Sequence, residues 1–449
     1  MYAYSCGVRS ARKIERACVE DVALKMIAMM ETPDHATIAR FVDRHEAALG
    51  ELFGQVLGLC GEAGLVRPGV VAIDGTRLAG NASRESTRDF GQIAREIVAE
   101  AKAIDAAEDE LYGDQRGDEL PEQLRTREGR AEFFRQARER ASGSVSDRPQ
   151  PSAAEPEPAS SDEPQFGFDT ERIVARHQGR EGWTRDARRQ LEQRRWDAPD
   201  PVCRSREGRL LLAGERLEAE RDGAVAANRA YEDYRANGRD TQGRRLGRRP
   251  NEWVAPDVPE GVVSVSDPDT QRMKANHGYV QGYNAQAVVD EGQIVIAAEI
   301  TNSPADFSQL DPMLTAAISE LDRAGVTARP QLALADAQYC NEQHIDEVIA
   351  NKHIQVLIPP DSAGRTAPRP GWTDGRYAWM RTVLGAHGKL LYRKRIQMIE
   401  PVFAHTKHNR AITRFHRRGR AAVRTEWRLL MATHNLTKLH RHQLATAGA

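Results

Sequence analysis

The sequence predicts an α/β protein in which helices surround a small sheet. Strand and helix patterns alternate after Val262, and the chain then continues into a basic helical segment. A short apolar run, Val70 to Asp74, interrupts a mainly helical N-terminal part. In that part apolar residues recur every three or four positions, as in amphipathic helices. Alternating strands and helices are typical of an α/β sheet covered by helices.

The elements after Val262 can be assigned in chain order. GYNAQAVVDEGQIVIAAEI, residues 282–300, predicts a β-hairpin with its turn at Asp290 to Gln293. The next segments are expected to be a helix, a strand, a helix and a strand, at residues 309–324, 331–335, 341–351 and 354–358. Elsewhere the periodicity predicts helices at residues 8–63, 92–141 and 169–236.

Charge is segregated along a chain whose formal net charge is −1. Between Glu96 and Glu163 there are eighteen acidic and nine basic residues. Between Lys389 and Arg441 fourteen Lys and Arg stand against two acids, a local balance of 14 − 2 = +12. Such a basic segment favours a polyanionic partner. Residues 142–165 hold five prolines among Ser, Ala and acids, which predicts a disordered linker.

Five scattered cysteines, none with metal-ligand spacing, indicate thiols in a reducing compartment. No apolar run reaches membrane-spanning length, and no signal peptide is visible. We therefore expect a cytoplasmic protein without a membrane partner.

One acid, Glu400, lies within the basic segment YRKRIQMIEPVFAHTK, residues 392–407. Lys407 follows Glu400 by seven residues, about two helical turns, and so shares roughly its face. Helical spacing also predicts a core-facing stripe with Glu400 at its edge, formed by Ile396, Ile399 and Phe403. An ordinary surface acid is the alternative interpretation of Glu400.

Three acids stand where an α/β sheet exposes its sites. Asp74 and Asp336 end the apolar runs VVAID and LALAD, which places both at the carboxyl ends of buried strands. With Glu400 they form a set of carboxylates that suits Mg²⁺. Two such ions would stabilise the attacking and leaving oxygens of a phosphodiester displacement. Alternatively, Asp74 begins a hairpin turn at Gly75, and Asp336 caps the following segment.

Two local patterns leave alternatives open. Pro401 either begins the last basic helix or kinks it. Asp267 and Asp269, in SDPDTQRMK, either supply a metal ligand or form a turn before Thr270, and the turn is favoured.

Four motifs occur in order: VAIDGTRLAGNAS, SDPDTQRMKANHGYVQGYNAQAVVD, LADAQYCNEQHI and YRKRIQMIEPVFAHTKHNRAITRFHRRG. Together they resemble the DDE transposases of bacterial insertion sequences, in particular the eleven-eighty-two group of the insertion-sequence-five-like superfamily. The resemblance covers nearly the whole chain. It implies an RNase H-like catalytic core and two Mg²⁺ ions, with Mn²⁺ as an alternative metal. It also implies a homodimer bound to double-stranded DNA, at terminal inverted repeats and target DNA.

Residue by residue, the resemblance assigns the catalytic and metal-binding acids to Asp74, Asp336 and Glu400. This sequence departs from the superfamily's Tyr-x-x-Arg-x-x-x-Glu pattern, because Arg395 lies five residues before Glu400 rather than four. Arg393 and Arg395 are therefore both candidates for contact with DNA. The other expected DNA-binding residues are Lys407, Arg410, Arg414, Arg417 and Arg418.

The resemblance also divides the chain into four parts. An N-terminal helical DNA-binding domain is expected at residues 1–65, and the first strand region of the core at residues 66–85. A long helical insertion is expected at residues 86–255, and the rest of the core with basic C-terminal helices at residues 256–442. Met1 runs into CGVRSARKIERAC without a capping residue. The first domain is therefore expected to be truncated, which would leave apolar residues such as Leu24 and Ile27 poorly covered.

The leading interpretation is a DNA transposase that cleaves strands with water and joins them through a 3′-hydroxyl. One alternative is an RNase H-like nuclease without strand transfer. Another is an inactive, truncated transposase that only binds DNA, although the intact set of three acids argues against it.

Overall fold

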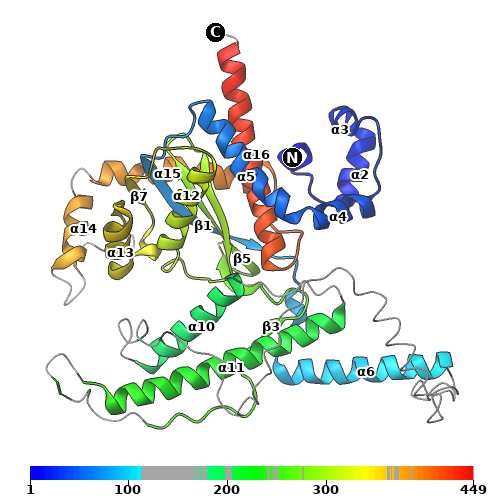
Figure 1. Cartoon of the computed structure of the whole chain (residues 1–449), viewed down its shortest axis with the longest axis vertical. Coiled ribbons are helices and arrows are strands. Elements are labelled where there is room, and N and C mark those ends of the chain that lie inside the picture. The colour runs from blue at the N-terminus through cyan, green and yellow to red at the C-terminus, as the bar shows by residue number, and fades with distance from the viewer. Residues whose placement is uncertain are drawn as a thin grey trace, which may run out of the picture. The chain divides into compact units, whose positions relative to one another are not determined.

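The computed structural model describes residues 1–112, 169, 173, 179–197, 205–239, 243–244, 246, 251–275, 278–361, 365, 367–368, 374–385 and 388–447. They fall into two compact units (Figure 1). The first unit comprises Met1–Arg88, Pro199–Arg204 and Val263–Ala449, and the second comprises Asp89–Ala198 and Ser205–Val262. The predicted linker at residues 142–165 lies outside the described residues.

One sheet of six strands forms the centre of the first unit: β1 (Val70–Ala79), β4 (Gln271–Ala275), β5 (Gly278–Asp290), β6 (Val295–Thr301), β7 (Leu332–Leu334) and β8 (Gln355–Leu357). The strand order is β4-β5-β1-β7-β8, and β6 also pairs with β5. Strand β5 runs antiparallel to β1, β4 and β6. Strands β1, β7 and β8 are parallel to one another. The predicted hairpin and both later strands are thus confirmed, within a mixed α/β fold.

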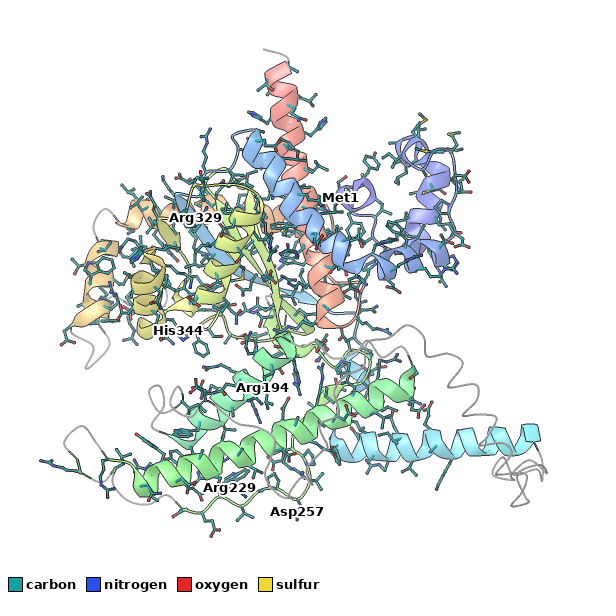
Figure 2. All side chains as sticks on the ribbon, viewed as in Figure 1. Met1, Arg194, Arg229, Asp257, Arg329 and His344 are labelled. Atoms are coloured by element: carbon teal, nitrogen blue, oxygen red, sulfur yellow. The ribbon has the colours of Figure 1, made fainter. Side chains whose placement is uncertain are left out.

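Burial explains why these segments read as apolar runs rather than alternating ones. All seven residues of β6 are buried, as are those of β5 from Gly282 to Asp290. A strand covered on both faces needs apolar side chains on both. The core continues into aromatic side chains from different elements, with Phe415 edge-on to Tyr283 and to Trp427. Figure 2 draws the described side chains on the ribbon.

The first unit also contains the following helices: α1 (Tyr2–Ser5), α2 (Ala11–Glu20), α3 (Val22–Ile27), α4 (His35–Arg44), α5 (Glu46–Glu62), α12 (Leu310–Arg323), α13 (Glu342–Lys352), α14 (Gly375–Gly385), α15 (Gly388–Ala404) and α16 (Arg420–Ala447). Helix α16 packs against α5 and β6, and α15 packs against β1 and β5. Short 3-10 segments occur at Arg84–Ser86 and Ala337–Tyr339. The side chains of Ser10, Asp21 and Asp34 cap α2, α3 and α4.

The N-terminal helices match the expectation in part. Helix α1 has no side-chain cap, as predicted. Leu24 is only 7% exposed, so the expected poor cover is wrong at that residue, whereas Ile27 is 61% exposed.

Helix α15 also differs from its prediction. It continues through Pro401 to Ala404 and leads into a π-helical turn at His405–Asn409, so a helix start at Pro401 is wrong. Ile396 is 53% exposed and does not belong to the core-facing stripe. Ile399 and Phe403 are buried as predicted, together with Met398 and Val402. The prediction of the buried face is therefore confirmed at two residues and wrong at Ile396.

The second unit is helical, with α6 (Phe90–Tyr112), α10 (Arg180–Asp197) and α11 (Arg206–Asn237). Helix α11 packs against both α6 and α10. Trp183 contacts Tyr231 with ring centroids 5.8 Å apart, and Arg206 pairs with Glu96 at 2.8 Å. In the sequence the unit lies between β2 (Thr87–Arg88) and β3 (Val263–Ser264), two short antiparallel strands of the first unit.

Candidate active site

Asp74 lies in β1, and Asp336 lies just beyond the end of the adjacent parallel strand β7. The register pairs Val71 with Ala333 and Ala72 with Leu334, so each aspartate stands two residues beyond the last matched pair. Asp336 also caps the 3-10 segment Ala337–Tyr339, accepting the N–H of Gln338 at 2.9 Å. Asp336 therefore agrees with both interpretations that the sequence left open. Its carboxylate follows the end of the strand and also caps the next segment.

The expectation that β1 ends at Asp74 is wrong. Strand β1 continues to Ala79 and pairs with β5 along that whole length, so Asp74 does not begin a hairpin turn. Gly75 is the position where polar side chains crowd the backbone, because an added Cβ would lie within 3.0 Å of Gln286, Asn284 and Asp306.

Burial sets the protonation chemistry of the two aspartates. Burial, opposed by Arg395 and assisted by the nearby Asp336 charge, raises the pKa of Asp74 to about 6. Burial likewise raises the pKa of Asp336, with a further rise from the charge of Asp306. Two carboxylates that share a poorly solvated place require a cation to remain ionised together.

Arg395 supplies positive charge at this place. Its Nη1 donates to Asp74 Oδ2 at 2.7 Å, and the two side chains are 11% and 16% exposed. The guanidinium also lies 5.8 Å from the ring centroid of Tyr392, one turn earlier on α15. Arg395, rather than the exposed Arg393, is therefore the arginine of this segment that faces the aspartates.

Glu400 is exposed on α15. In the described part of the chain no three His, Cys, Asp or Glu side chains are close enough to hold a metal ion together. Lys407 is influenced by both Asp74 and Glu400. Burial lowers the pKa of Lys407, and the negative charges of Asp74 and Glu400 oppose that change. The structure thus places Asp74 and Asp336 close enough for their charges to interact, and it places Lys407 within reach of the charges of both Asp74 and Glu400.

Asp306 is a site residue that the sequence analysis missed. It is 2% exposed and accepts hydrogen bonds from Asn284 Nδ2 at 2.6 Å, Gln286 Nε2 at 2.8 Å and Arg77 Nη2 at 3.1 Å. Arg77 also reaches Gln338 at 3.2 Å, just after Asp336. No spacing rule points to Asp306, because it lies in an irregular loop after β6. The two amides that hold it, Asn284 and Gln286, are buried polar residues of β5.

Asp267 and Asp269 form the favoured turn. The N–H of Thr270 donates to the carbonyl of Asp267 at 3.1 Å. The Asp267 carboxylate accepts the hydroxyl of Tyr283 at 2.9 Å, and Asp269 accepts the N–H of Arg420 at 2.7 Å. These two acids therefore hold the backbone at the start of α16.

The predicted DNA-binding arginines have different environments. Arg410 is buried and donates to Tyr4 O, Leu430 O and Thr433 Oγ1 at 2.6, 3.0 and 2.6 Å. Arg417 is half-buried and pairs with Glu46 at 2.7 Å. Both stabilise the packing of helices, contrary to the expectation of exposed phosphate ligands. Arg393, Arg414 and Arg418 are exposed.

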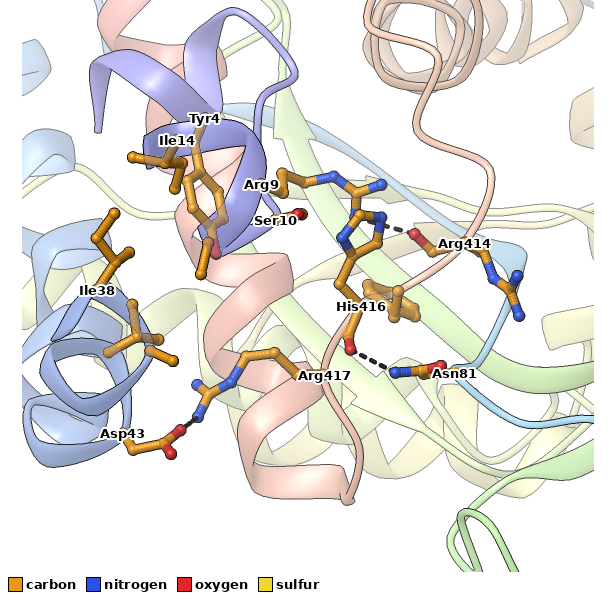
Figure 3. Close-up of a pocket in the computed structure, with 14 residues that line it drawn as sticks. Tyr4, Arg9, Ser10, Ile14, Ile38, Asp43, Asn81, Arg414, His416 and Arg417 are labelled. Carbon is orange, nitrogen blue, oxygen red and sulfur yellow. Dashed lines mark hydrogen bonds and ion pairs between the residues drawn. The ribbon is translucent and has the colours of Figure 1, made fainter. Parts of the chain in front are cut away.

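A pocket of about 450 Å³ lies between the N-terminal helices and the segment after the π-helical turn (Figure 3). Apolar side chains such as Ile14, Ile38 and Val42 line one part of it, and Arg414, His416 and Arg417 line another. Arg9 donates to the carbonyl of Arg414 at 2.9 Å within this region. The pocket is thus distinct from the place where Asp74 and Asp336 meet.

Comparison with known protein families matches two separate parts of the chain. Residues 257–436 match a family described as a transposase DDE domain, and residues 1–44 match a family described as a transposase domain. Searches of curated proteins and of solved structures gave no match. No helix among the described residues is long and apolar enough to cross a membrane. Two separate parts of this chain are thus similar to transposase domains, and the longer of them is similar to a DDE domain.

Proposed function

We propose that this protein cleaves DNA at the terminal inverted repeats of an insertion sequence and joins the ends to target DNA. The observation that carries the proposal is the placement of Asp74 and Asp336, each two residues beyond the last matched pair of adjacent parallel strands. The sheet also supports an RNase H-like core, because antiparallel β6, β5 and β1 are followed by parallel β7 and β8. We also propose that the protein acts in the cytoplasm and binds DNA as a homodimer. We assign it to the eleven-eighty-two group of transposases.

The two aspartates fit a divalent metal. They are adjacent, poorly solvated carboxylates, and the cation beside them is a side chain that can move. Carboxylate oxygens are the ligands that Mg²⁺ prefers, and Mn²⁺ accepts the same ligand type. Asp74 and Asp336 would hold the metal, with Glu400 as the third acid. When bound, the metal supplies charge stabilisation to the attacking and leaving oxygens of a phosphodiester.

The remaining residues of the site bind and orient. Lys407, between Asp74 and Glu400, is placed to contact a phosphate next to the reacting group. The exposed side chains of Arg393, Arg414 and Arg418 add phosphate contacts farther along the DNA. Asp306 fixes Arg77 and, through it, Gln338, so the backbone after Asp336 is held in place.

The test is Mg²⁺-dependent cleavage of a DNA fragment that carries the flanking inverted repeats. Asp74→Asn, Asp336→Asn and Glu400→Gln should each lower the cleavage rate at least 100-fold, with DNA affinity retained. Asp322→Asn is the matched control, because that carboxylate is exposed and pairs only with surface Arg329 among the contacts described. Full cleavage by any of the three acid variants contradicts the assignment of that acid. Cleavage without joining of pre-cleaved ends would favour the nuclease.

A further inference from the structure

The guanidinium of Arg395 lies where a cation at the two aspartates would lie. Its Nη1 is 2.7 Å from Asp74 Oδ2, and its charge also acts on Asp336. Strand β1 holds Asp74, and Asp336 caps the 3-10 segment after β7, whereas Arg395 reaches Asp74 from α15 through a long side chain. The movable member of this group is therefore the arginine.

We propose that Arg395 is an internal counter-ion that occupies the cation position at Asp74 in the DNA-free protein and must leave before a divalent metal ion binds there. This inference rests on the proposed function, since it takes Asp74 and Asp336 as metal ligands. It adds that the chain carries its own competitor for the metal.

The contacts of Arg395 suit a residue that leaves. One nitrogen, Nη1, bonds to Asp74, so the pair lacks the two parallel bonds of the strongest arginine–carboxylate contacts. Its Nε is buried without a hydrogen-bond partner among the described residues. A buried donor without a partner weakens the arrangement. Arg395 is thus held mainly by charge, and a divalent cation competes for the same charge.

A DNA phosphate gives the displaced guanidinium a new partner. Arg395 lies on the same helix as exposed Arg393, and a guanidinium matches the oxygens of a phosphate well. DNA would then draw Arg395 away from Asp74 and make room for the metal. Because binding free energies are reciprocal, bound metal would strengthen DNA binding by the same factor.

The experiment measures binding of Mn²⁺ alone to the full chain without DNA, by calorimetry and by the electron-spin resonance signal of free Mn²⁺. Arg395→Met should tighten Mn²⁺ binding at least tenfold relative to the unmodified chain. Arg393→Met is the matched control, because it removes the same charge two residues earlier on the same helix and should change the affinity less than about twofold. Adding Asp74→Asn to Arg395→Met should abolish the tight site. Arg395→Gln repeats the test with a polar side chain if the Met variant does not fold.

The counter-ion role is overturned if the unmodified chain and both Arg395 variants bind Mn²⁺ with equal affinity and that binding depends on Asp74. This result would still support the metal site. Absence of Asp74-dependent binding in every variant would overturn both this inference and the metal site of the proposed function. Equal tightening by Arg393→Met would show a general charge effect, which also contradicts a specific role for Arg395.

Discussion

Arg9 and Glu426 form an ion pair inside the protein: Nη1 of Arg9 lies 2.5 Å from Oε1 of Glu426, and the side chains are 5% and 0% exposed. Glu426 also accepts the backbone N–H groups of His416 and Arg417, both at 3.0 Å from Oε2. The pair joins the segment before α2 to α16. It therefore connects the two parts of the chain that match separate transposase families.

Glu426→Gln should lower the free energy of unfolding by about 3–5 kcal/mol, because it leaves the Arg9 charge buried without its partner. Chemical denaturation measures the loss. Glu31→Gln is the control, an exposed glutamate in the same N-terminal region, and it should change stability by less than about 0.5 kcal/mol. A loss below about 1 kcal/mol for Glu426→Gln would mean that the pair does not hold the two parts together.

Gly75→Ala should destabilise the protein by about 1–3 kcal/mol and disturb Asp74. The new Cβ would lie 2.5 Å from Asn284 Oδ1 and 2.9 Å from Asp306 Oδ1, so buried polar side chains must shift. Thermal unfolding measures the effect. Gly69→Ala, where nothing lies within 4 Å of the added Cβ, is the matched control. An unchanged melting temperature for Gly75→Ala would contradict the crowding beside Asp74.

Replacing Arg393, Arg414 and Arg418 together by Gln should flatten the salt dependence of DNA binding by about 0.9 per lost phosphate contact, or roughly 2.7 in total. The effect should be the same for all DNA sequences, because phosphates carry no sequence information. Binding titrations at several salt concentrations measure the slope. If the triple variant keeps the original slope, the DNA contacts a different face.

Arg410→Met should behave differently, with lower stability and a nearly unchanged salt slope in the folded fraction. Its guanidinium has three buried acceptors, and burial lowers its pKa to about 10. Removing it deletes three buried hydrogen bonds from a charged donor, each of which contributes about 1.5–3 kcal/mol. Denaturation measures the stability, and binding titrations on the same preparation measure the salt dependence of DNA binding. A salt slope that falls by about one would show that Arg410 contacts DNA.

His434 should make the protein less stable in acid. Burial lowers its pKa to about 3, and its Nε2 lies 3.0 Å from the carbonyl oxygen of Gln293. The unfolded histidine titrates near 6.5, so the stability is present above that pH and is lost as the pH falls toward 3. Between pH 7 and pH 5 the loss from this group is about 2 kcal/mol. His434→Gln should remove that loss in denaturation experiments, whereas exposed His440→Gln should keep it.

The local patterns of the sequence carried much of the fold. The apolar runs before Asp74 and Asp336 are buried strands, and they pair in parallel. The extension of β1 beyond Asp74 could not be predicted, because it depends on pairing with β5, more than two hundred residues away in the sequence. Pairing over that separation has no local signal.

The candidate site was predicted less completely. Spacing placed Ile396 toward the core, but α15 turns Arg395 toward Asp74 and leaves Ile396 53% exposed. Spacing alone could not show this, because the partner of Arg395 lies on a distant strand. Burial of Arg410 depends on the meeting of α1 and α16. Asp306 is recognisable only from the amides that surround it in space.

The pairing of β1 with β5 also affects how the chain is made. Val71 pairs with Asp290 and Ala79 with Gly282, so a ribosome adding 5–20 residues per second needs about 10–40 s between the two strands. The whole second unit is synthesised in that interval. During this time β1 has unpaired edges, which are prone to pairing with other chains. Messenger RNAs truncated before the β5 codons would therefore yield aggregation-prone fragments. Slow translation would increase the need for chaperones.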